Sequence, residues 1–135
     1  RIEAVSAKLL AALDYIEARI PQKDIPGKRV FIGEYGFPIS AVGTARAQKQ
    51  ASLAVAIAAL QWGCPFILYW EMYDNEAEEG GTGGKGYWMI DNKGVKQPVY
   101  EVHYNYYKWA KKFIADKKPS DEEFRKAAVE FLKQQ

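Results

Sequence analysis

The sequence is poor in the residues that build redox and metal centres. It has one cysteine, Cys64, and one histidine, His103, among 135 residues. A single cysteine excludes an intrachain disulfide and a multi-cysteine zinc site, and a Ser-His or Cys-His catalytic pair would depend on His103 alone. We expect Cys64 to be an inert buried thiol and His103 to lie at or near the surface. No metal site and no cofactor is predicted.

Long apolar runs and a charge of one sign are also lacking. No run approaches the roughly 18 residues of a membrane span. The 19 Lys and Arg residues are interspersed with 17 Asp and Glu residues, for a net charge of +2. We therefore expect neither a membrane nor a nucleic-acid partner. Arg1 lies inside a helical pattern, so the natural start is expected upstream of it. Localisation is left open, with a secreted parent enzyme as one option.

What the sequence does contain is typical of a globular domain: 48% hydrophobic residues, with 4 Trp, 9 Tyr and 6 Phe. Two short β-branched and aromatic runs, joined by a long apolar helical segment, predict a parallel βαβ unit with both strands buried. A tyrosine stripe near residues 100–107 is expected to pack in the core. The expected elements are a helix over 1–20, a strand over 29–32, a helix over 44–62, a strand over 66–70, a helix over 98–115 and a last helix headed by the Ser120 capping box.

Glu34 is the strongest candidate for chemistry. It follows the first predicted strand and stands between Gly33 and Tyr35-Gly36. The carboxyl ends of parallel strands form the active-site face of α/β folds, and a carboxylate held there can act as a nucleophile or a base. The alternative is a structural Glu34 that pairs with Arg29 or Lys28 or points into solvent. Position alone does not separate the two.

Trp70 ends the second predicted strand at the equivalent place. Its indole would face the same cleft as Glu34 and stack on a ring, although plain core packing is the commoner role for such a residue. Glu71, Asp74, Asn75 and Glu76 follow on the same rim, either as partners for ligand hydroxyls or as solvated loop charges. The glycine run 80–84 lacks the ending of a phosphate-binding loop and is read as a lid or linker.

Three motifs together resemble the clan A glycoside hydrolases, the cellulase-like TIM barrels. The run 30–36, Val-Phe-Ile-Gly-Glu-Tyr-Gly, is similar to their strand seven, which ends in the nucleophilic Glu. The run 66–70, Phe-Ile-Leu-Tyr-Trp, is similar to strand eight, whose terminal Trp stacks on the sugar. The segment 86–98 is similar to the stretch before the last barrel helix. The motifs occur in the family's order over residues 29–115.

The resemblance implies an α/β fold, the C-terminal portion of a (β/α)8 TIM barrel. The chain would supply about strands 7 and 8 with helices 6 to 8, plus an extra C-terminal helix. Residues 1–116 would be the barrel segment, and residues 117–135 an appended amphipathic helix. Because a whole barrel takes about 250 residues, the remainder of the barrel would come from the same or another chain.

The function implied by this resemblance is part of a retaining glycoside hydrolase acting on β-linked carbohydrate. Glu34 would be the catalytic nucleophile. The acid/base Glu would lie outside these residues, so the chain alone is expected to be inactive. Two alternatives stay open: a non-catalytic carbohydrate-binding barrel, and a self-associating α/β interaction module unrelated to sugar. The residues expected to bind substrate are Trp70, Tyr35, Glu71, Asn75 and Trp88.

Overall fold

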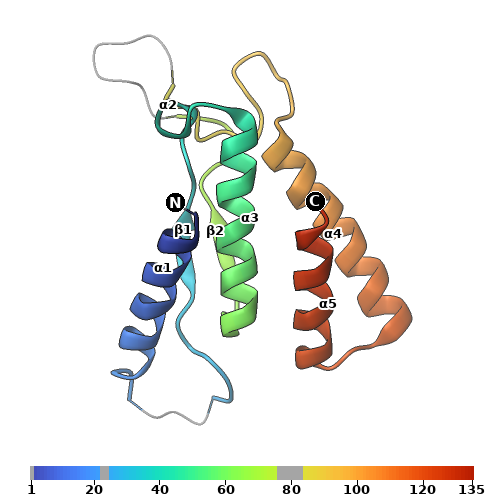
Figure 1. The fold of residues 1–135 in the computed structure, drawn as a ribbon. Helices are drawn as coiled ribbons and strands as arrows, with labels where there is room; N and C mark the ends of the chain where they lie inside the picture. The colour runs from blue at the N-terminus through green and yellow to red at the C-terminus, as the bar shows by residue number, and fades with distance from the viewer. Residues whose placement is uncertain (1, 22–24, 76–83) are drawn as a thin grey trace.

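The structure, a computed structural model, describes residues 2–21, 25–75 and 84–135. A two-stranded parallel sheet stands against α1 and α3, and α4 and α5 form a helical pair on the far side of α3 from α1 (Figure 1). The elements in chain order are α1 (Ile2–Glu17), β1 (Ile32–Tyr35), α2 (Ile39–Val42), α3 (Ala45–Trp62), β2 (Ile67–Tyr69), α4 (Pro98–Lys117) and α5 (Asp121–Lys133).

The prediction that this chain is a portion of a TIM barrel is wrong. In the described part of the chain, five helices accompany two strands of only four and three residues, which form one small open sheet. The fold is therefore dominated by helices. The parallel pairing of the two strands is as expected, but a barrel needs a tilted sheet that closes on itself, and a two-stranded sheet does not do this.

The strand β1 begins later than the predicted strand over 29–32, because the first backbone N–H groups of the predicted strand donate to a side chain and not to β2. The backbone N–H groups of Arg29 and Val30 donate to Glu17 Oε2, at 3.0 and 2.9 Å, and Arg29 Nε donates to Glu17 Oε1 at 3.0 Å. Burial alone would raise the pKa of Glu17, but these hydrogen bonds together lower it. The end of α1 therefore holds the chain just before β1, and pairing with β2 begins only at Ile32.

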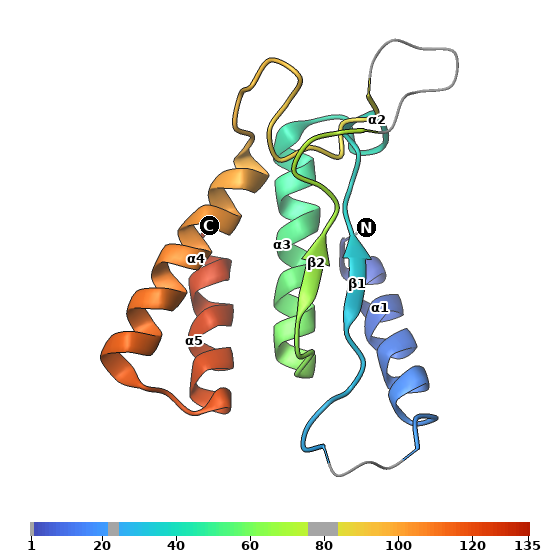
Figure 2. The same cartoon turned by 180° about the vertical axis from the view of Figure 1, so that it is seen from behind.

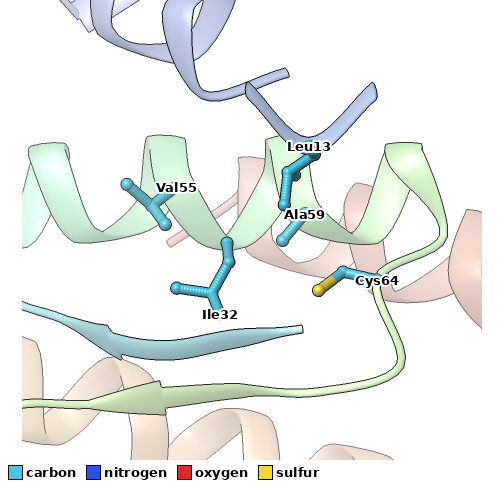
Figure 3. Packing of buried hydrophobic residues seen from close by; sticks show 5 residues of the cluster. All are labelled: Leu13, Ile32, Val55, Ala59 and Cys64. Carbon is cyan, nitrogen blue, oxygen red and sulfur yellow. The ribbon is translucent and has the colours of Figure 1, made fainter. Parts of the chain in front are cut away.

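The helix that joins the strands has the limits that the sequence predicts. The Thr44 side chain accepts a hydrogen bond from Ala47 N at its start, and Gly63, in the left-handed conformation, ends it. Its alanines let α1 and the sheet approach closely. The main core cluster lies at this junction (Figure 3) and consists of Leu13, Ile32, Val55, Ala59 and Cys64. Cys64 is buried, as expected.

The opposite face of the sheet carries no helix among the described residues (Figure 2). Phe31 and Phe66 stack there with ring centroids 4.3 Å apart, and about half of each side chain is exposed. Leu68, in the middle of β2, is exposed as well. The prediction of a strand buried on both faces is therefore wrong, since the sheet is buried on one face only. This second face, which we call the open face, is apolar at its centre.

The second helical layer is held together by aromatic rings. Trp109 of α4 stacks on Phe131 and Phe124 of α5, with centroids 4.8 and 5.8 Å apart. The tyrosine stripe expected in the core is instead largely outside, since Tyr104 and Tyr107 are exposed. Lysine side chains lie over the rings of both, which provides contacts that an exposed ring can make in water. The last helix packs against α3 as well as α4.

His103 is half-buried, as expected of a residue at or near the surface, and it links α4 to the sheet. Its Nε2 is 3.2 Å from Tyr35 Oη, and its Nδ1 is 2.7 Å from Val99 O. Because a carbonyl oxygen can only accept, Nδ1 carries the proton, and in the neutral ring Nε2 then accepts from Tyr35. Burial lowers the pKa of His103, and the hydrogen bond to Val99 only partly offsets this effect.

We predict that this histidine makes the fold less stable in mild acid. A folded-state pKa below the unfolded value of about 6.5 means that the unfolded chain binds more protons, so the free energy of unfolding falls as pH drops below about 6.5. His103→Gln should flatten this slope. Urea unfolding between pH 5 and 7.5 measures it, and equal slopes for the two proteins would contradict the prediction.

Candidate functional site

An extra residue in β1 determines where Glu34 lies. Ile32 pairs with Ile67 and Tyr35 pairs with Tyr69, so three steps along β1 match two along β2. Ile32 and Tyr35 consequently both face the helices, where Ile32 joins the core and Tyr35 reaches His103. Gly33 and Glu34 are both exposed. A regular strand would place Glu34 on the same side as Ile32; the irregular register turns it away from the helices.

The carboxylate of Glu34 does not pair with Arg29 or Lys28, the two partners considered for a structural role. Arg29 pairs with Glu17, and the ammonium group of Lys28 lies 4.5 Å from the centre of the Trp62 ring. Among the described residues Glu34 makes neither a hydrogen bond nor an ion pair. Its side chain is therefore an exposed carboxylate at the carboxyl end of a strand, available to a ligand or to solvent.

The carboxyl ends of the two strands meet closely beside this residue. Trp70 N donates to Tyr35 O at 2.7 Å, which extends the pairing beyond β2. A Cβ at Gly36 would lie only 2.0 Å from Trp70 O, so no residue with a side chain fits there without displacing the backbone. The glycine after Tyr35 is thus what allows the chain segments carrying Glu34 and Trp70 to leave the sheet side by side.

The indole of Trp70 is half-buried, and its polar edge points inward. Its Nε1 is inaccessible to solvent and has no acceptor among the described residues. A buried donor without an acceptor is uncommon and costs free energy. The ring is therefore neither a fully packed core residue nor an exposed one, and part of its surface stays open to a partner. The peptide bond that follows it is cis.

The acidic residues after Trp70 are engaged with nearby backbone. Glu71 Oε1 accepts from Asn75 N at 3.2 Å, and Asp74 Oδ2 accepts from Gly86 N. Both carboxylates thus organise the loop that follows β2. The candidate Glu76 and most of the glycine run 80–84 lie outside the described residues.

Gln48 is the residue of this rim that sequence reasoning missed. It lies in the polar first part of α3, yet it is fully buried. Its Nε2 donates to Phe37 O and to Gly86 O, both at 2.8 Å, and so ties together the two loops that leave the strand ends. Its Oε1 has no partner in the described part of the chain. One polar residue among the polar residues of a helix's first turns is a weak signal, since most such residues face solvent.

The six predicted site residues do not gather in one place. Tyr35 points to the helix side, where it contacts His103 and packs edge-on against Tyr69. Glu34 is on the other side of the strand, and Trp70 leaves the adjacent strand end. Trp88 is half-buried in the segment that returns toward α4. Their assignment to substrate binding stays a prediction.

The comparisons with known proteins add no relative, since no family model, curated protein or solved structure matches the chain. None of the helices in the described ranges is both long and apolar enough to cross a membrane. The same ranges contain no group of three or more His, Cys, Asp or Glu side chains placed to hold a metal ion. The site must therefore be interpreted from its own geometry.

The close approach at Gly36 gives a direct prediction. Gly36→Ala should push the strand ends apart and lower the free energy of unfolding by about 2 kcal/mol or more, because the new methyl group overlaps the Trp70 carbonyl. Gly33→Ala, in the same strand, is the matched control: its Cβ would meet only Phe31 at 3.5 Å, an ordinary contact. Equal stability of the two variants in thermal or urea unfolding would show that the approach is not required.

Proposed function

We propose that this chain supplies the nucleophile and the sugar-stacking surface of a retaining glycoside hydrolase acting on β-linked carbohydrate. The observation that carries the proposal is the position of Glu34. The irregular register of β1 turns away from the helices, at the carboxyl end of a parallel strand, a carboxylate that has no partner in the described part of the chain. Bulges of this kind occur beside active sites, where they redirect a side chain.

Nucleophilic attack on a sugar, the role proposed for Glu34, requires an accessible carboxylate. In a retaining enzyme one carboxylate attacks the anomeric carbon as the leaving oxygen departs, and water later releases the glycosyl group from the enzyme. A nucleophile in this role must be reachable by substrate and must not be neutralised by an ion pair. Glu34 meets both conditions among the described residues.

Trp70 supports the carbohydrate assignment. It leaves the adjacent strand where the Trp70–Tyr35 backbone hydrogen bond ends the pairing, and continued alternation along β2 assigns it to the open face with Leu68. A partly exposed indole can stack on a sugar ring. Its Nε1, which has no acceptor among the described residues, supports a role for this side chain beyond packing.

The second carboxylate of the reaction would come from outside residues 1–135. A retaining mechanism needs two carboxyl groups about 5–5.5 Å apart. On this rim Glu71 and Asp74 already hold backbone N–H groups of their own loop. The segment that brings the acid/base would also cover the apolar open face around Phe31, Phe66 and Leu68.

We predict that Glu34→Gln abolishes turnover while leaving binding intact. The amide has the shape of the carboxylate but cannot form the covalent intermediate, so turnover should fall by a factor of about 10³ or more. Kinetics on an aryl β-glycoside, in the enzyme that contains both carboxylates, measure the loss. Glu101→Gln, which removes an exposed carboxylate on α4, is the control and should retain activity.

Rescue by azide tests whether Glu34 is the nucleophile or a carboxylate that does not attack the sugar. Glu34→Ala leaves room for azide to attack the anomeric carbon in place of the carboxylate, so azide should restore part of the activity. Near-normal turnover in Glu34→Gln would remove the nucleophile assignment. Sugar binding without any turnover in the wild-type protein would favour a non-catalytic carbohydrate-binding module. Absence of both turnover and sugar binding would favour the self-associating module.

A further inference from the structure

A cavity on the helix side of the sheet is unrelated to the rim around Glu34. It has a volume of about 670 Å³, it is partly open to solvent, and it is lined by residues of β1, β2, α3, α4 and α5 and of the loops beside them. This size is within the range of small-molecule sites. Figure 1 shows α4 and α5 standing beside α3, and all three helices contribute residues to the cavity wall. Most of its wall is apolar, with contributions from Ala56, Leu60, Ile67, Val102, Phe124 and Leu132.

The polar groups of the wall are mainly hydrogen-bond acceptors. Three hydroxyl groups have already donated their protons inside the protein: Ser52 to Gln48 O at 2.8 Å, Tyr69 to Tyr87 O at 3.2 Å, and Tyr35 to His103 Nε2 at 3.2 Å. Each hydroxyl oxygen keeps a lone pair. A ligand that donates a hydrogen bond is therefore matched to this wall, whereas an anion would be repelled by the lone pairs.

The same groups are held in their uncharged forms. Burial raises the pKa of Tyr35 above its usual range and raises that of Tyr69 to about 12. Burial lowers the pKa of His103. Tyr106, whose pKa burial also raises against the opposing effect of Arg125, has a hydroxyl without a partner among the described residues. A ligand hydroxyl could both donate to the wall and accept from Tyr106.

Fixed charges are confined to one part of the wall. Lys28 and Asp121 are exposed, and Arg125 uses Nη1 to donate to Cys64 O at 3.1 Å. These groups carry opposite signs, so they create no strong preference for a ligand of one charge. The side formed by the strands, α3 and α4 has no ionised side chain.

We propose that this cavity is a binding site for an uncharged, ring-bearing small molecule with a hydroxyl group. The apolar wall takes the rings, and a lone pair of Ser52, Tyr35 or Tyr69 accepts the hydroxyl proton. This site is separate from the proposed carbohydrate rim, because neither Glu34 nor Trp70 lines the cavity and Glu34 faces away from the helices.

Three matched probes test the ligand class. The first is 2-naphthol, which is neutral at pH 7 and donates one hydrogen bond; 2-methoxynaphthalene keeps the rings without the donor, and 2-naphthoate carries a negative charge. Titration followed by protein NMR or calorimetry should give a dissociation constant of about 1 mM or below for 2-naphthol. The methyl ether should bind about fivefold more weakly, the factor of one ordinary hydrogen bond, and the carboxylate more weakly still.

Two variants locate the binding. Ala56→Phe fills the cavity and should weaken 2-naphthol binding at least tenfold, while Ala115→Phe, which adds the same ring at an exposed position of α4, should leave it unchanged. Ser52→Ala removes one acceptor with little change in volume. It should reduce the preference for 2-naphthol over its methyl ether, and it keeps the test open if Ala56→Phe fails to fold.

Several results would overturn the proposal. They are no measurable binding of 2-naphthol to the wild-type chain, equal affinity in folded Ala56→Phe and wild type, and binding of 2-naphthoate as tight as that of 2-naphthol. The last result would assign the cavity to an anion held by Arg125. None of these results bears on Glu34, so failure here and failure of the glycosidase proposal are distinguishable.

Discussion

The extra residue between Ile32 and Tyr35 is the constraint on which the candidate site depends. It allows one short strand to place both of these side chains against the helices and to turn Glu34 the other way. Gly36 then admits the Trp70 carbonyl where a Cβ would overlap it. Without the irregular register, a charged side chain would enter the layer between sheet and helices, where its desolvation would cost several kcal/mol.

The regular elements were predictable because local signals agree with the packing. Thr44 and Gly63 bound α3, Ser120 accepts from Glu123 N to begin α5, and Pro98 opens α4, all at or near the expected positions. Parallel pairing followed from the length of the connection between the strands. The start of β1 could not be predicted in this way. The backbone N–H groups of Arg29 and Val30 donate to the Glu17 carboxylate, 12 and 13 residues earlier in the chain, and no local sequence pattern indicates this contact.

The barrel prediction failed because the resemblance covers short local motifs, whereas a barrel depends on how many strands pair with one another. The motifs around Glu34 and Trp70 describe strand ends, and nothing in them specifies how many strands stand beside them. The face that a barrel would enclose is open here, with Phe31, Phe66 and Leu68 exposed. Likewise the sequence indicated that Glu34 follows a strand, but the side on which it lies depends on the register with β2, and the burial of Gln48 depends on two loops meeting over α3.

The central claim is that Glu34 forms a covalent bond to sugar, and trapping that intermediate tests it most directly. A 2-deoxy-2-fluoro β-glycoside with a dinitrophenolate leaving group suits the purpose. The leaving group departs without a proton donor, and the fluorine slows hydrolysis of the glycosyl-enzyme. Peptide mapping by mass spectrometry should find one glycosyl group on Glu34. A label on any other residue, or no label at all, would contradict the account.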